Sequence, residues 1–281
     1  MRTMEHREKG SKITGRQAHA AENSRRRAYA CLLEFACFEP MEYAALYTQL
    51  RIDALERIVP EKARTQSAAA ELAYLAAARA ACGGMFGACA VSLHELKARF
   101  DYSHAETGKP VLEDVFMSLS HTSHAALAVI APFAVGADIE HERRVSERIA
   151  KRIMSESEYA EFRLLDETEK NARILEYWTW KESFLKLTGE GILAGLDKLS
   201  CDRENAKVYR AETGESASLI RIDTVSRAQC ECESTTVGEA AGKTGGERLF
   251  ACICCKDEAE LVLLRFSSAQ EAASFILGNE R

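Results

Sequence analysis

The chain has 281 residues, of which 47% are hydrophobic, and its formal net charge is −6. A chain of this length buries roughly three quarters of its unfolded surface, which is enough for one large domain or two small ones. The negative charge argues against a general nucleic-acid binder, because such a surface repels a phosphate backbone unless basic residues gather in one place. We therefore expect any basic binding site to be local.

The termini and the apolar segments predict a cytoplasmic protein without membrane contacts. The longest apolar stretch, residues 125–137, contains Pro132 and is shorter than the roughly 20 residues that a membrane span needs. The first 25 residues are polar and charged, with no apolar core of the kind that secretory signals have. We predict that residues 1–25 are a disordered lead-in.

In the first half, an apolar strand is expected over residues 28–38, before Pro40. Residues 66–82 are rich in the best helix formers and predict a helix that stops at Gly83 and Gly84. A turn at 108–110 then leads to a strand over 115–119. A polar loop and a second apolar strand over 125–135 follow.

In the second half, helices are expected over residues 155–165 and 171–188, the second ending at Gly189. After residue 199 the sequence alternates like strands, and the segment 239–247 predicts a flexible loop. The arrangement favours an α+β fold of two similar subdomains, 26–134 and 135–281, divided near Gly136.

The ten cysteines predict structural thiols and no disulfides, as in a reducing compartment. Two groups near the C-terminus lack both the two-residue gap of common zinc sites and a nearby histidine, although a metal site is the alternative. The cysteines of the first half lie in segments that are apolar or rich in alanine, where a thiol packs as a small hydrophobic group. The cysteines of the first half are Cys31, Cys37, Cys82 and Cys89. The two groups near the C-terminus are Cys230 with Cys232, and Cys252 with Cys254 and Cys255.

Two acidic residues follow an apolar strand. Asp138 and Glu140 are two residues apart, so on a strand their side chains point to the same side. Oxygen atoms arranged in this way can share a hard cation such as Mg²⁺. An ordinary acidic strand end is the alternative interpretation.

A second candidate group lies on the helix expected over 171–188. Trp178, Glu182 and Lys186 recur every four residues and share one face, with Lys181 beside them. As a surface ion pair, Glu182 and Lys186 would contribute only about 0.3–0.5 kcal/mol. Trp178 predicts instead that this face is covered, and a covered carboxylate and ammonium need a reason to be there.

Two further polar groups have good structural alternatives. His121 at a strand end is as well explained by a structural role, and Ser120 is not a convincing nucleophile, because adjacent side chains on a strand point apart. Ser155 and Glu158 form a capping-box pattern, which gives Glu158 a structural role at a helix start.

Five motifs occur in one order, namely GKP at 108–110, SLSHT at 118–122, VGADIE at 135–140, SESEY at 155–159 and WTWKESFLKLTGEG at 178–191. In this order they resemble the surfactin-synthetase-type 4′-phosphopantetheinyl transferases over residues 55–199. The resemblance implies two α+β halves related by a pseudo-twofold axis, with coenzyme A bound in the cleft between them.

The resemblance also implies the residues of the site. Asp138, Glu140 and Glu182 would bind Mg²⁺, with Mn²⁺ as a substitute, and Asp138, Glu182 and Lys186 would be catalytic. In the family, a basic segment in this region binds coenzyme A, and the segment after Pro60 is shorter here. From it we carry over Lys62 as an expected contact of coenzyme A and add Arg64 as our own expectation. The full set of expected coenzyme A contacts is Lys62, Arg64, Gly108, Lys109, Pro110, Ser120, His121, Lys181 and Lys186.

The implied activity is transfer of the phosphopantetheine group of coenzyme A to a serine of an apo acyl or peptidyl carrier protein by a monomeric enzyme. 3′,5′-Bisphosphoadenosine would leave. One alternative is a carrier-binding module of the same fold without turnover. Another is a different magnesium-dependent phosphotransferase or phosphohydrolase that uses the same acids.

Overall fold

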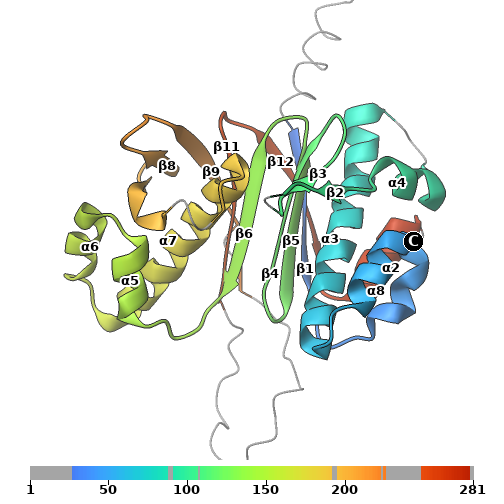
Figure 1. The fold of residues 1–281 in the computed structure, drawn as a ribbon, viewed down its shortest axis with the longest axis horizontal. Coiled ribbons are helices and arrows are strands. Elements are labelled where there is room, and N and C mark those ends of the chain that lie inside the picture. The colour runs from blue at the N-terminus through green and yellow to red at the C-terminus, as the bar shows by residue number, and fades with distance from the viewer. Residues whose placement is uncertain are drawn as a thin grey trace, which may run out of the picture.

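The structure is a computed structural model that describes residues 27–87, 91–106, 108–191, 195–222, 224–225 and 248–278. Two main β-sheets lie in the middle of the molecule and helices cover their outer sides (Figure 1). Helices and strands therefore both contribute to the core, and the predicted α+β class is confirmed.

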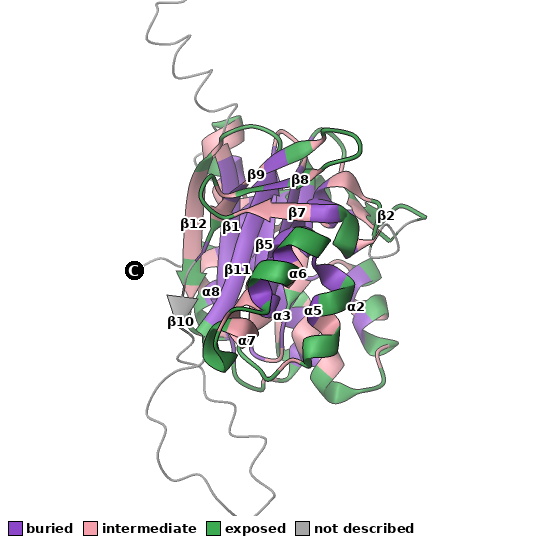
Figure 2. Cartoon of the chain, turned by 90° about the vertical axis from the view of Figure 1, so that its left-hand side faces the viewer, coloured by how far each residue is buried: buried purple, intermediate pink, exposed green. Residues whose placement is uncertain are grey.

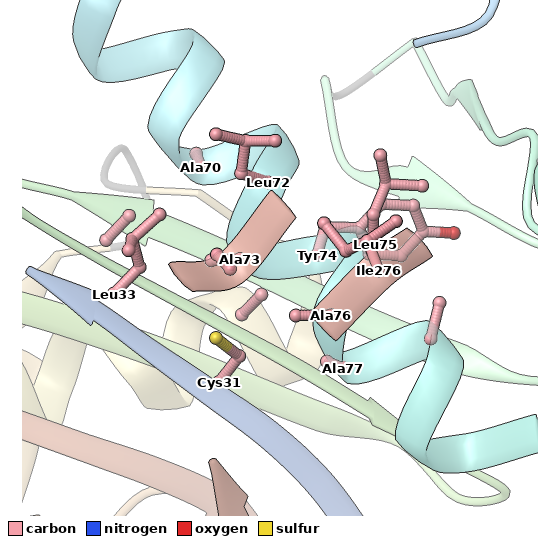
Figure 3. Close-up of a cluster of buried hydrophobic side chains, with 14 of the residues drawn as sticks. Cys31, Leu33, Ala70, Leu72, Ala73, Tyr74, Leu75, Ala76, Ala77 and Ile276 are labelled. Atoms are coloured by element: carbon pink, nitrogen blue, oxygen red, sulfur yellow. The ribbon is translucent and has the colours of Figure 1, made fainter. Parts of the chain in front are cut away.

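The first sheet has the strand order β12-β1-β5-β4. Its strands are β1 (Arg27–Glu34), β4 (Phe116–His121), β5 (Ala125–Ala131) and β12 (Glu260–Phe266). The long helix α3 (Glu61–Phe86) lies on the outer face of this sheet. Figure 3 shows Ala73, Ala76 and Ala77 of α3 beside Cys31 and Leu33 of β1. The small alanine side chains let the helix approach the sheet closely.

The second sheet combines β6 with the late strands of the chain. β11 (Arg248–Cys255) pairs with β6 (Val135–His141), β10 (Thr224–Val225) and β9 (Ser216–Arg221), and the order continues to β8 (Lys207–Arg210) and β7 (Leu199–Asp202). The helices on its outer face are α5 (Glu147–Ile153), α6 (Glu156–Phe162) and α7 (Glu167–Thr188).

An apolar layer between the two sheets joins them. Alternate residues of β1 and β5 pack here against alternate residues of β6 and β11. Figure 2 shows buried residues on these strands and exposed residues on the outer helices α5 and α6. At the edge of this layer the Ala137 amide donates to the Ser118 hydroxyl at 2.9 Å, which links β6 to β4. The last residues of β4 are thereby held beside β6.

The C-terminal elements cross back to the first half of the molecule. β12 pairs in parallel with β1, and α8 (Ala269–Leu277) contributes Ala272 and Ile276 to the cluster under α3. Residues 260–277 therefore belong structurally with the first sheet. This corrects their assignment to a second subdomain running from 135 to 281.

The helix expected to stop at Gly83 and Gly84 continues through both glycines to Phe86, four residues beyond Cys82. It ends at Gly87, whose φ of 66° gives the left-handed cap. A Cβ on Gly84 would lie 1.8 Å from the Tyr29 hydroxyl oxygen, so this glycine permits close packing on β1. Tertiary packing thus overrides the helix-breaking tendency of the two glycines, which is about 1 kcal/mol each.

The other expected elements are found with shifted ends, and several short ones are additional. The first strand ends at Glu34, and α5 and α8 were not predicted. The predicted lead-in and the loop at 239–247 lie outside the described residues. Within the described ranges, no helix has both the length and the apolar character needed to cross a bilayer. The remaining short elements are η1 (Pro40–Leu46), α2 (Gln49–Glu56), α4 (Leu93–Arg99), β2 (Ser103–His104), β3 (Pro110–Val111) and η3 (Leu196–Lys198).

Most of the described cysteines pack as the sequence predicts. Cys31, Cys82 and the three cysteines of β11 are buried free thiols, and burial raises the pKa of Cys31 and Cys252. Cys37 is exposed, so the expectation of burial is wrong at this position. Cys89, Cys230 and Cys232 lie outside the described residues.

Candidate active site

The acids of β6 face helix α7 because the strand and the helix pack without a gap at Gly136. A Cβ at Gly136 would lie 2.0 Å from the Ser183 carbonyl oxygen and 2.4 Å from the Leu187 amide nitrogen. Strand alternation puts Asp138 and Glu140 on the same side as Gly136. The close approach therefore brings both carboxylates toward the face of α7 that carries Glu182 and Lys186.

Asp138 is the centre of the polar contacts. Its Oδ1 accepts from Lys186 Nζ at 2.7 Å and from the Ser120 hydroxyl at 2.8 Å. Its Oδ2 is buried and has no hydrogen-bond partner among the described residues. Residues of β4, β6 and α7 thus meet at one carboxylate.

Glu182 and Glu140 lie in the same electrostatic environment. Glu182 is buried, and its Oε1 has no hydrogen-bond partner within the described ranges. Glu140 forms an ion pair with Arg143 at 3.1 Å. Burial and then the negative charge of Asp138 raise the pKa of both glutamates, each to about 7. Repulsion among three carboxylates is the situation that a bound cation relieves.

The donor set fits a hard cation, but its present geometry is not that of a formed metal site. Carboxylate oxygens are the ligands that Mg²⁺ prefers, and two of those available here, on Asp138 and Glu182, are buried and unsatisfied. In the described part of the chain, no three His, Cys, Asp or Glu side chains converge closely enough to hold a metal ion. Lys186 provides the positive charge beside Asp138 in this arrangement.

A pocket of about 680 Å³ opens beside these residues, between the first sheet and α7. Its walls come from α3, the β2–β3 hairpin, the end of β4 and the C-terminal half of α7. The pocket is lined by Glu182 and by six of the predicted coenzyme A contacts, namely Gly108, Lys109, Pro110, Ser120, His121 and Lys186. Partial burial and the Lys186 ammonium lower the pKa of His121, which favours its neutral form.

The hairpin that carries Gly108 and Lys109 reaches across to α7. Gly108 has a φ of 81°, and its amide donates to the Ala105 carbonyl at 2.8 Å, which closes the turn. Lys109 Nζ donates to the Leu187 carbonyl at 2.8 Å, close to the end of α7. The predicted nucleotide-side turn is therefore fixed to the helix that carries Glu182.

Lys181 is not part of the pocket, which corrects the expectation that it lies at the edge of the site. It is fully buried on the opposite side of α7. Its Nζ donates to Glu158 Oε2 at 2.5 Å and to the Ile153 and Leu199 carbonyls at 2.7 and 2.6 Å. Glu158 also accepts from the Ser155 amide, so the predicted capping box is confirmed. Both residues have structural roles.

Lys62 and Arg64 are also absent from the described walls of the pocket. They lie on the first turn of α3, where Lys62 is exposed. Arg64 Nε donates to the Ile58 carbonyl at 3.0 Å. The structure thus does not bring these two cations to the predicted coenzyme A site.

Several residues of the pocket wall were not predicted, among them three with titratable side chains. Glu71 of α3 lines the pocket with Tyr102 and His104, and burial raises the pKa of Glu71 to about 7. A signal for Glu71 was available, because it is the one charged residue in the alanine-rich segment 68–78. Tyr102 and His104 stand in a segment without a helical or strand pattern, so nothing marked them.

Comparison with known proteins agrees with this site. Residues 134–238 match the sequence model of the 4′-phosphopantetheinyl transferase superfamily. The chain is 34% identical over 135 residues to the 4′-phosphopantetheinyl transferase HetI of Nostoc, which covers 45% of this chain and 56% of that protein. It is 35% identical over 131 residues to the 4′-phosphopantetheinyl transferase Sfp of Bacillus subtilis, which covers 46% and 58%.

The chain thus spans slightly more than half the length of these relatives. The matched model includes β6 and α7, the elements that carry Asp138, Glu140, Glu182 and Lys186. The sequence matches and the packing of the two elements therefore agree on a similarity to the 4′-phosphopantetheinyl transferase superfamily, with the family model matching residues 134–238.

Proposed function

We propose that this protein transfers the 4′-phosphopantetheine group of coenzyme A to a serine of an apo carrier protein. The observation that carries the proposal is the meeting of Glu182 and Lys186 with Asp138 beside a pocket, within the segment that matches the superfamily. The pocket volume of about 680 Å³ is in the range of small-molecule and cofactor sites.

The reaction is a displacement at phosphorus. The carrier serine oxygen forms a bond to the β-phosphorus of coenzyme A, and the bond from that phosphorus to the bridging oxygen breaks. 3′,5′-Bisphosphoadenosine leaves with the bridging oxygen, and the serine proton must go to a base. Such a step depends mainly on positioning and on neutralisation of charge.

The residues of the site would divide these tasks. Of the three acids, Glu182 is the one that lines the pocket, and its pKa of about 7 suits a base that takes the serine proton. Lys186 would neutralise charge on the phosphates, moving from its contact with Asp138. Asp138, Glu140 and Glu182 would hold Mg²⁺, which when bound supplies further charge neutralisation at the pyrophosphate.

The test is the intact mass of purified apo acyl and apo peptidyl carriers after incubation with the protein, coenzyme A and Mg²⁺. We expect one carrier or both to gain the mass of one phosphopantetheine group, and we expect a chelator to abolish the gain. A gain that persists in the chelator would contradict the magnesium requirement. No gain on either carrier would contradict the transferase proposal for these carrier classes.

One observation favours a second candidate, a carrier-binding module without turnover. Lys62 and Arg64, the expected basic contacts of coenzyme A, do not line the described pocket. Titration of the protein with coenzyme A separates the two candidates, because a silent module would bind carrier protein without binding coenzyme A. The cytoplasmic, monomeric state expected from the sequence stays a prediction.

A further inference from the structure

Ser118 is a buried polar residue on the face of β4 that is turned toward the second sheet. It is only 4% exposed, and its cross-strand neighbour on β5 is Val129, which belongs to the apolar layer between the two sheets. Ser120 shares this face of β4, because side chains alternate along a strand. A hydroxyl group buried in such a place costs free energy unless it is hydrogen bonded, so the partner of Ser118 is informative.

The partner of Ser118 is the backbone of β6, one residue before Asp138. The Ala137 amide donates to the Ser118 hydroxyl oxygen at 2.9 Å. Among the described strands, β6 forms a backbone ladder with β11 alone, so its edge toward β4 has no such ladder. A buried amide at that edge needs another acceptor, and the Ser118 side chain supplies it. This contact thus takes the place of strand pairing where β4 and β6 meet.

A second hydroxyl group on the same face of β4 holds the carboxyl group of Asp138. Ser120 donates to Asp138 Oδ1 at 2.8 Å, so two residues of β4 bond to two consecutive residues of β6. On the other side of β6, the close packing of Gly136 against α7 leaves no room for a shift toward the helix. The backbone before Asp138 is therefore fixed from both sides.

The fixed backbone determines where the second carboxylate oxygen of Asp138 lies. Oδ1 accepts from Lys186 and Ser120, whereas Oδ2 is buried without a hydrogen-bond partner in the described part of the chain. Oδ2 is thus the oxygen left for a ligand. Phosphoryl transfer depends on positioning, and a misplacement of about 1 Å can cost about 10²-fold in rate. A residue that fixes β6 therefore affects the reaction without touching the reactants.

We propose that Ser118 is a positioning residue for the transfer reaction and that it acts through Asp138. The inference rests on the proposed function, because it is the transfer step that requires Asp138 in place. Ser118 also lines the pocket, so a direct contact with coenzyme A is the competing role. The two roles differ in their kinetics, since loss of a binding contact raises the KM for coenzyme A and loss of a positioning contact lowers kcat.

The first test compares Ser118→Thr with Ser118→Val, which have the same shape and differ in the hydroxyl group. We expect Ser118→Thr to keep most of the wild-type rate, and Ser118→Val to lose about tenfold or more in kcat with an unchanged KM for coenzyme A. Ser216→Val, at an exposed position of β9, is the control and should change neither constant. A raised KM with the wild-type kcat in Ser118→Val would overturn the inference in favour of a contact with the donor.

The second test removes the serine with and without Asp138. Ser118→Ala adds no methyl group to the buried face, so it serves even if the larger variants do not fold. It should lower the rate about tenfold in the wild-type background and leave the residual rate of Asp138→Ala unaltered, because the effect passes through Asp138. An equal fold loss in both backgrounds would show that Ser118 acts independently of Asp138, and the inference would fail while transfer stands.

The third test needs no turnover. Hydrogen exchange of the peptide that contains Ala137 should be faster in Ser118→Ala than in the wild type, because the amide loses its acceptor, and Ser118→Thr should restore the slow rate. Exchange at the wild-type rate in Ser118→Ala would overturn the contact on which the inference depends. If the wild-type protein itself modifies neither carrier, the proposed function fails and the inference fails with it.

Discussion

Asp138 and Glu182 each keep one buried oxygen without a hydrogen-bond partner in the described part of the chain, although both lie close to Lys186 in a crowded polar site. Such oxygens cost stability unless a ligand satisfies them, so a native protein that retains them gains something in function. Glu71 differs, because its buried carboxyl group accepts a hydrogen bond from the Tyr102 hydroxyl at 2.8 Å.

Replacing the site acids should therefore remove transfer without unfolding the protein. For Asp138→Ala and Glu182→Gln we expect carrier modification to fall by at least about 10²-fold, because each removes charge that organises the reacting phosphates. Glu169→Gln, an exposed position on the same helix, is the control. Intact-mass rates measure the effect and circular dichroism checks the fold. Wild-type rates in both variants would refute the assignment of these acids.

Glu71 makes a prediction about pH and stability. Its pKa is about 7 in the folded chain, above the ordinary value of 4.5, so the folded state binds the proton more tightly than the unfolded state. This group therefore stabilises the fold most below pH 4.5, and that contribution is lost as the pH rises toward 7. Denaturant unfolding should show Glu71→Gln gaining about 1–3 kcal/mol relative to wild type between pH 5 and pH 8. A pH-independent difference would contradict the raised pKa.

At the scale of elements, α7 has two polar faces with different tasks. One face carries Glu182 and Lys186 into the pocket, while Lys181 on the other is bonded to backbone near α5 and β7. Lys181→Met should cost about 3–5 kcal/mol of unfolding free energy, because it leaves Glu158 buried without its cation. The KM for coenzyme A should stay that of wild type while the protein is folded. A raised KM without lost stability would restore Lys181 to the site.

The contact of β6 with α7 is tested at Gly136. Ala at this position would force the Ser183 and Leu187 backbone away, so we expect a loss of about 1–3 kcal/mol or more and a large loss of transfer, since Asp138 moves with the strand. Gly83→Ala is the matched control, because no atom lies within 4 Å of its new Cβ and the position is helical. It should stabilise the protein by about 0.5–1 kcal/mol. Equal effects of the two substitutions on thermal unfolding would contradict this packing argument.

These elements show what local pattern can predict. The four-residue spacing placed Glu182 and Lys186 on one face of α7, where both line the pocket, since helical periodicity is a property of the segment itself. Trp178, one step earlier in the same spacing, is only partly buried and is not among the described residues of the pocket wall. The partners of Lys181 come from Ile153 and Leu199, which the sequence does not connect to it. The same reason explains Lys62 and Arg64, whose distance from the pocket depends on where the whole of α3 packs.

At the scale of the whole molecule, pairing between strands that are far apart in the sequence decides which elements belong to each sheet. β12 pairs with β1 across more than two hundred residues of sequence, for example Ala30 with Leu263, and no periodicity marks that choice of partner. The assignment of the C-terminal elements to the second half was therefore wrong, while the boundary near Gly136 stays a prediction. Because the chain crosses between the halves and the two sheets share an apolar layer, we infer that they unfold together.

Ile276→Ala tests this coupling, because Ile276 lies fully buried on α8 in the cluster of the first half. The substitution should cost about 2–5 kcal/mol. Both tryptophans of the chain, Trp178 and Trp180, are on α7 in the other half, so their fluorescence reports on that half alone. If the halves are one cooperative unit, Ile276→Ala shifts the fluorescence midpoint in denaturant together with the circular dichroism midpoint. Leu277→Ala, at the half-exposed neighbouring position, is the control and should shift neither midpoint appreciably. A fluorescence midpoint that stays at the wild-type value would mean that β12 and α8 stabilise the first sheet without holding the two walls of the pocket together.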